Sequence, residues 1–151
     1  MPLDLFVEFK ELVRALDAAG VQYAVVDALA VAIHGAPRAT TDIHLLLERE
    51  GLARALDVGR ALGFTFPAFP PTFRDGTEVQ RVTKIQGDDT LTLDFLLVND
   101  TLEPAWSSRQ RLEADFGPLT VVSRDALIRM KVAAGRPRDL GDVASLEEMD
   151  R

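Results

Sequence analysis

Residues 25–48 of the chain read VVDALAVAIHGAPRATTDIHLLLE, and this stretch decides the fold. Two short apolar runs, residues 23–26 and 42–47, predict buried strands. Residues 28–34 between them predict a short helix, because Gly35 and Pro37 follow as helix-ending residues. Asp27 precedes this helix and is predicted to act as its N-cap, which stabilises a helix by ~1 kcal/mol.

The segments on either side of this stretch complete a mixed α/β pattern. Residues 64–76 are rich in proline and predict a loop or an irregular edge rather than a central strand. The order of elements fits an α+β fold or a mixed-sheet α/β fold, and it does not fit a doubly wound parallel sheet. The remaining predicted elements are helices at 3–19, 50–62, 123–134 and 138–149, and hairpins formed by 79–86 with 90–98 and by 109–115 with 119–122.

Length and composition narrow the class of protein. A chain of 151 residues with 47% hydrophobic residues suits a single domain, residues 1–151, with a sizeable core. The absence of cysteine excludes disulfides and thiolate chemistry. Neither a membrane span nor a secretory signal is predicted, so we expect a cytoplasmic protein. A net charge of −7 weighs against a large nucleic acid as partner, and the excess of arginine over lysine favours a GC-rich, bacterial origin.

The stretch around residues 25–48 resembles the active-site signature of the nucleotidyltransferase superfamily that includes polymerase beta. The matching residues are His34-Gly35, Pro37-Arg38, Thr40 and Asp42, with the family's spacing between them. The likeness is greatest to the small bacterial abortive-infection and toxin–antitoxin type. Asp94 stands where this branch has its third carboxylate, and residues 127–142 resemble its terminal helices. The resemblance implies a nucleotidyltransferase fold, with a small mixed β-sheet flanked by helices and a C-terminal helix pair.

In that family a nucleoside monophosphate passes from a nucleoside triphosphate to RNA, protein or a small molecule, with Mg²⁺ or Mn²⁺ held by carboxylates. The resemblance therefore implies that Asp42 and Asp94 are catalytic and that Asp42, His44 and Asp94 are the metal ligands. It also implies that residues at positions 27 and 28, here Asp27 and Ala28, face the nucleotide. The remaining nucleotide-binding residues that it implies are Arg38 and Lys131.

Three positions depart from the family pattern. Asp27 and Ala28 replace a glycine and a glycine or serine, and His44 replaces the second metal-binding aspartate. A carboxylate beside a polyphosphate is repelled by ~4 kcal/mol per unit charge at 4 Å near a surface. Imidazole is also a poor ligand for Mg²⁺. Our hypothesis is a catalytically impaired pseudoenzyme or binding module that needs no cofactor and has a possible protein partner. The alternative is an active metal-dependent nucleotidyltransferase that binds a nucleoside triphosphate.

Several of these residues also have structural interpretations. Asp42, His44 and Asp94 fit either a weak transition-metal site or a carboxylate–histidine hydrogen bond. His34 is expected to bond a nearby carbonyl at the end of its helix. Lys131 is expected either to bind phosphate or to be a solvated lysine on a helix face. Ion pairs between the last two helices are expected from Arg136, Arg138, Asp139 and Asp142.

Overall fold

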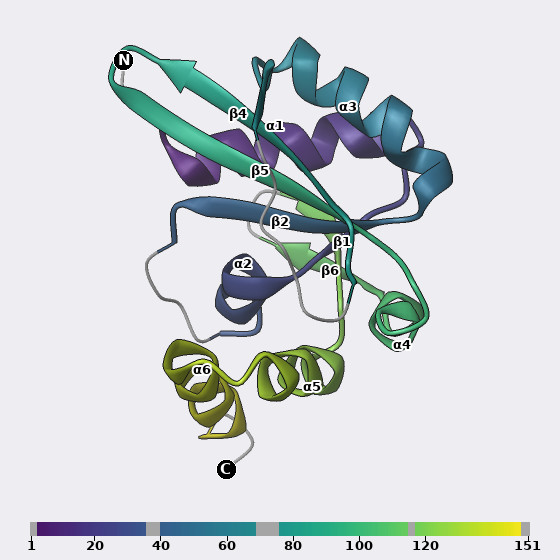
Figure 1. Ribbon diagram of the computed structural model, residues 1–151, viewed down its shortest axis with the longest axis vertical. Coiled ribbons are helices and arrows are strands. Elements are labelled where there is room, and N and C mark those ends of the chain that lie inside the picture. Colours follow the sequence, from purple (N-terminus) through teal and green to yellow (C-terminus); the bar gives the residue numbers. More distant parts are fainter. Residues whose placement is uncertain (1–2, 36–39, 69–75, 115–116, 149–151) are drawn as a thin grey trace.

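The computed structural model describes residues 3–35, 40–68, 76–114 and 117–148 (Figure 1). Nearly all the predicted helices and strands are present, and β2 has the predicted bounds. The short helix α4 was not predicted. The elements are α1 (Leu5–Ala18), β1 (Ala24–Val25), α2 (Asp27–Ile33), β2 (Asp42–Leu47), η1 (Arg49–Gly51), α3 (Leu52–Ala61), β3 (Phe66–Ala68), β4 (Val79–Gln86), β5 (Asp89–Leu97), α4 (Glu103–Ser107), β6 (Gln110–Ala114), β7 (Gly117–Val121), α5 (Arg124–Ala134) and α6 (Pro137–Glu148).

The strands of the described residues form one mixed sheet in the order β3-β4-β5-β2-β1-β7-β6. Strand β2 runs parallel to β5, and β1 runs parallel to β7, whereas the other neighbours are antiparallel. The mixed sheet and the two predicted hairpins, β4–β5 and β6–β7, are therefore confirmed. Strand β3 lies at the edge of the sheet, as the proline-rich segment predicted.

Helices cover both faces of this sheet. Figure 1 shows α1 and α3 on one side, and α2, α5 and α6 on the other. Two helix ends have the predicted chemistry. The Ser123 side chain accepts a hydrogen bond from the amide of Ala126, and Gly135 ends α5 in the left-handed conformation. None of the helices among the described residues has the length and apolar character needed to cross a bilayer.

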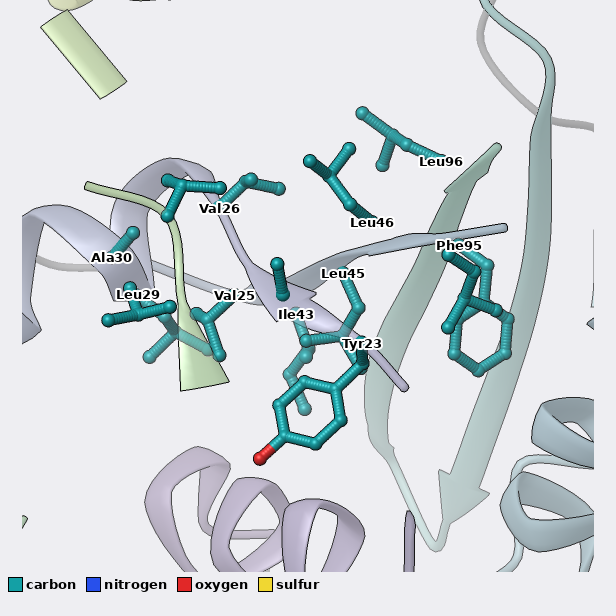
Figure 2. Close-up of a cluster of buried hydrophobic side chains, with 14 of the residues drawn as sticks. Tyr23, Val25, Val26, Leu29, Ala30, Ile43, Leu45, Leu46, Phe95 and Leu96 are labelled. Carbon is teal, nitrogen blue, oxygen red and sulfur yellow. The ribbon is translucent and has the colours of Figure 1, made fainter. Parts of the chain in front are cut away.

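The core lies around the central strands, where buried side chains of β1, β2 and β5 meet (Figure 2). Strand β2 is covered on both faces, so Leu45 and Leu46 are both fully buried although they point in opposite directions. Tyr23 is buried beside them, and its hydroxyl accepts a hydrogen bond from the amide of Thr120 over 3.2 Å. A polar side chain on a strand that is covered on both faces needs a hydrogen-bond or ion-pair partner. His44 is such a side chain on β2, so its partners are of interest.

Candidate functional site

Three neighbouring strands place three polar side chains in one row. His44 on β2 lies opposite Asp94 on β5 in the parallel register, and Asp94 lies opposite Arg81 on β4 in the antiparallel register. Residues directly opposite each other in a sheet point to the same face. This face is the one that α2, α5 and α6 cover, and α2 brings Asp27 to the row.

Asp27 is the first residue of α2, and its φ of +60° lies in the left-handed region. The predicted N-cap role is wrong, because the cap position is Val26 and no side chain caps this end. The Asp27 carboxylate instead accepts a hydrogen bond from Nδ1 of His44. A left-handed backbone at a residue other than glycine costs roughly 1–2 kcal/mol, so this contact is made against local strain.

His44 bridges two carboxylates. Its Nδ1 contacts Asp27, and its Nε2 lies 3.3 Å from Oδ2 of Asp94. Burial lowers the pKa of His44, but the hydrogen bonds and negative charges of Asp27 and Asp94 outweigh burial and raise the pKa to about 9. The imidazole is therefore protonated at neutral pH. The carboxylate–histidine hydrogen bond that forms joins His44 to Asp27, whereas Asp94 lies within ion-pair distance of the same imidazole.

The pKa values of Asp27 and Asp94 are lowered, whereas the pKa of His44 is raised. Burial raises the pKa of Asp27, but the hydrogen bond with His44 and the positive charges of His44 and Lys131 lower it to about 2. Burial also raises the pKa of Asp94, and there the hydrogen bonds from Arg81 and His44 prevail and lower it. Both groups are thus carboxylates at neutral pH, and each has a cation beside it.

Arg81 is the functional residue that the sequence analysis missed. Its Nε donates to Oδ1 of Asp94 over 2.7 Å, and its terminal nitrogen donates to Oδ2 over 2.8 Å. Asp94 is 1% exposed, so this two-pronged contact lies against a buried carboxylate. The predicted hairpin placed β4 beside β5, but its turn was one residue too long, and the observed pairing of Gln86 with Asp89 is what sets Arg81 opposite Asp94.

Lys131 on α5 closes the other end of the row. Its Nζ lies 3.2 Å from Oδ2 of Asp142, 3.3 Å from Oδ1 of Asp139 and 3.6 Å from Oδ1 of Asp27. The interpretation of a solvated lysine is wrong, because Lys131 is 2% exposed. Arg136 also pairs with Asp139, over 2.6 Å. Asp139 and Asp142 do form ion pairs between the last two helices, but their partner there is Lys131, and Arg136 pairs with Asp139 just before α6.

These contacts form one continuous ion-pair network across β4, β5, β2, α2, α5 and α6. Among the described residues its ion pairs join four cations and four carboxylates, and the charges of these eight residues balance when His44 is protonated. The residues of the ion-pair network are Asp27, His44, Arg81, Asp94, Lys131, Arg136, Asp139 and Asp142.

The other predicted site residues lie around the ion-pair network. Asp42 is half-buried on the same strand face as His44, and it accepts a hydrogen bond from the hydroxyl of Thr41 over 3.3 Å. Ala28 is buried in α2. Arg38 lies outside the described residues. His34 bonds the carbonyl of Val122 over 2.9 Å, which confirms its expected role at the helix end.

The donor set does not fit a magnesium ion in this arrangement. Mg²⁺ needs several oxygen ligands, whereas both oxygens of Asp94 accept hydrogen bonds from Arg81, and Asp27 is held by His44 and Lys131. Over the described ranges, no three histidine, aspartate or glutamate side chains are grouped so as to hold a metal ion. That Asp42, His44 and Asp94 ligate a metal therefore stays a prediction.

A cavity of about 350 Å³ lies elsewhere, at the opposite end of β1. None of the residues that line it belongs to the ion-pair network, so the network and this hollow are separate features. Its lining includes the side chains of Asp17, Tyr23, Arg109 and Arg111. Arg111 forms a two-pronged ion pair with Asp17, over 2.9 and 3.0 Å.

No protein-family model matches the sequence, and no curated protein matches it. Solved structures do share its fold. The lincomycin-bound lincosamide antibiotic adenylyltransferase LnuA has a TM-score of 0.68 at 10% identity, covering 93% of this chain and 95% of that one. The aminoglycoside-complexed ANT(2")-Ia, solved with adenylyl-2"-tobramycin, has a TM-score of 0.63 at 15% identity, covering 93% and 86%.

A nucleotidyltransferase-like protein from Paracoccidioides brasiliensis has a TM-score of 0.56 at 17% identity, covering 95% of this chain and 76% of that one. Because these matches extend over nearly the whole of this chain, they establish that it has the nucleotidyltransferase fold. Identities this low show the fold alone, so the chemistry has to be argued from the residues of the site.

Proposed function

We propose that the chain is a nucleotidyltransferase-fold protein that does not catalyse metal-dependent nucleotidyl transfer and acts instead as a binding module. The observation that carries this proposal is the position of His44 between Asp27 and Asp94. Four residues to which the resemblance gives metal or nucleotide roles, Asp27, His44, Asp94 and Lys131, belong to the ion-pair network. This supports the proposal, because these groups already bind charged partners within the chain.

The carboxylate of Asp27, at the start of α2, opposes the binding of a nucleotide. The Asp27 carboxylate stands where the resemblance expects the phosphates, and its charge is already balanced by His44 and Lys131. A triphosphate carries several negative charges and needs surplus cations or helix N–H groups to bind. Because the charges of the ion-pair network balance internally, a triphosphate has to break existing pairs before it gains new ones.

The alternative is an active transferase of the toxin–antitoxin type, which moves a nucleoside monophosphate to RNA, protein or a small molecule with Mg²⁺ or Mn²⁺. The shared fold supports this alternative, since LnuA is an adenylyltransferase and ANT(2")-Ia was solved with an adenylylated antibiotic. Those two proteins favour a small-molecule acceptor over RNA or protein. Under this alternative Asp42 and Asp94 would hold the metal, and Lys131 with Arg38 would bind phosphate.

A binding module needs a surface or cavity for its ligand, and the cavity beside Tyr23 is the candidate. Its volume of about 350 Å³ lies within the range of small-molecule sites. It also brings Arg109 and Tyr23 together with the Arg111–Asp17 pair, which supplies both charge signs for recognition. A protein partner on another face and a cytoplasmic location both stay predictions.

The deciding experiment incubates the protein with labelled nucleoside triphosphates and Mg²⁺ or Mn²⁺, and measures transfer to protein, RNA and an aminoglycoside. We expect no transfer and no calorimetric nucleotide binding. Robust turnover by the parent protein contradicts the proposal. The matched variant combines Asp27→Gly, Ala28→Gly and His44→Asp. We expect it to gain nucleotide binding that the parent lacks, which would show that these positions oppose nucleotide binding.

A further inference from the structure

The guanidinium of Arg81 contacts both carboxylate oxygens of Asp94, the same two atoms that would bind a metal ion. Both oxygens of Asp94 accept from one guanidinium, over 2.7 and 2.8 Å. Asp94 is almost fully buried, whereas the side chain of Arg81 is 27% exposed. A buried carboxylate requires a compensating positive charge, and Arg81 brings that charge in from the rim of the site.

A second carboxylate acts on the same guanidinium. Asp42 lies two residues before His44 on β2, so its side chain shares the face of the row. The guanidinium of Arg81 is hydrogen-bonded to Asp94, and the negative charge of Asp42 also acts on it. Arg81 is therefore held in the field of the two aspartates that the resemblance assigns to a metal.

A guanidinium and a divalent cation cannot share this carboxylate. Arginine stays charged at every accessible pH, so Arg81 cannot give up its charge to a metal by losing a proton. The Nε2 atom of His44 also lies 3.3 Å from Oδ2 of Asp94. A metal bound to Asp94 would meet the guanidinium at short range, and it would have to displace Arg81 to obtain an oxygen ligand.

We infer that Arg81 occupies the place of a divalent cation on Asp94 and is the residue that decides whether this site accepts a metal. This inference rests on the proposed function and gives it a cause at a residue that does not belong to the signature in residues 25–48. The guanidinium is an internal cation, held by the hairpin register of β4 and β5. It neutralises the carboxylate permanently, where a metal would do so reversibly.

The test measures Mn²⁺ binding by electron paramagnetic resonance for the parent, Arg81→Met and Arg81→Lys. We expect no bound Mn²⁺ in the parent at millimolar metal. Arg81→Met should gain at least about tenfold in Mn²⁺ affinity, because Asp94 loses its internal cation. Arg81→Lys keeps a positive charge and should remain closed. Mn²⁺ binding by the parent that is as tight as in Arg81→Met overturns the inference.

A control variant separates this local effect from a change in overall charge. Arg49→Met removes one positive charge from the exposed Arg49–Glu78 pair, far from Asp94 in the register of the sheet. It should leave Mn²⁺ binding unchanged. An equal gain in Arg49→Met and Arg81→Met contradicts the inference, because it would trace the effect to net charge alone.

A measurement on the parent protein guards against poor folding of Arg81→Met. The ¹H–¹⁵N resonance of Arg81 Nε should show slow hydrogen exchange and should not change when millimolar Mg²⁺ is added. Loss of this resonance with Mg²⁺ means that metal displaces Arg81, which overturns the inference. These readouts are independent of nucleotide transfer. Transfer by the parent would therefore refute the proposed function, whereas an Arg81→Met variant without added metal affinity would refute only the role of Arg81.

Discussion

The Nε2 atom of His44 lies 3.3 Å from Oδ2 of Asp94, and the two residues are directly opposite each other in the parallel pairing of β2 and β5. Two central strands thus hold a protonated imidazole against a buried carboxylate. With Asp27 at its other nitrogen, His44 is fixed on both sides. The stability of this arrangement depends on the charge of one histidine, which makes it measurable.

Stability should fall at alkaline pH because of His44. Its pKa is raised from 6.5 to about 9 in the folded chain. The stabilisation is therefore fully present below pH 6.5, and it is lost as the pH rises towards 9. The change amounts to about 3 kcal/mol over that window. Urea unfolding across this pH range measures it, and His44→Gln should lack this loss. A parent curve that stays flat above neutral pH would count against the bridging imidazolium.

Glycine at position 27 should be better tolerated than alanine. Both substitutions remove the carboxylate that pairs with His44 and Lys131, so each should destabilise the chain by roughly 1–3 kcal/mol. Asp27 has a φ of +60°, which glycine adopts freely and alanine does not. Asp27→Gly should therefore be about 1 kcal/mol more stable than Asp27→Ala in chemical denaturation. The reverse order would disprove the left-handed backbone at this residue.

Removing the charge of Lys131 should be costly. Lys131→Met keeps most of the side-chain volume but leaves Asp27, Asp139 and Asp142 without their shared cation. Breaking a buried ion pair from one side costs about 3–5 kcal/mol. Thermal and urea unfolding measure this loss. The matched control is Lys10→Met, because Lys10 is a half-buried lysine on α1. This variant should change stability by less than about 1 kcal/mol. Similar losses in both variants would argue against a special role for Lys131.

The hydroxyl of Tyr23 should stabilise the fold independently of the ion-pair network. It accepts a hydrogen bond from the amide of Thr120 at the buried end of β1. Tyr23→Phe leaves that amide without its acceptor, at a cost of about 1–2 kcal/mol. The double variant with Lys131→Met should show additive losses, since the described contacts of Tyr23 and Lys131 join them to different residues. Strong non-additivity would show that the two regions are coupled.

The secondary structure and the mixed sheet could be predicted from the sequence because they depend on local patterns. Apolar runs bounded by glycine and proline marked the strands, and the turn at Gly87 marked the β4–β5 hairpin. The pairing of Arg81 with Asp94 depends on the exact length of that turn. The predicted strands leave three residues between them, whereas β5 begins at Asp89, and this shift of one residue sets Arg81 opposite Asp94 rather than Phe95.

The contacts of Asp27 and Lys131 could not be predicted from local patterns, because they depend on tertiary packing. An aspartate before a helix fits an N-cap equally well, and only the position of His44 explains the left-handed backbone of Asp27. Likewise, the burial of Lys131 follows from the docking of α6 against α5, which no local pattern specifies. Whether the predicted metal and nucleotide residues act as such stays a matter for the binding experiments.

The ion-pair network also bears on the order of events during folding. Its members extend from Asp27 to Asp142, so its last pairs can form only after α6 has docked. Contacts between residues so distant in the chain tend to form late. Interactions absent from the folding transition state slow unfolding and leave the folding rate unchanged. The network should therefore set the lifetime of the native state, and Lys131→Met should accelerate unfolding while the refolding rate stays near that of the parent.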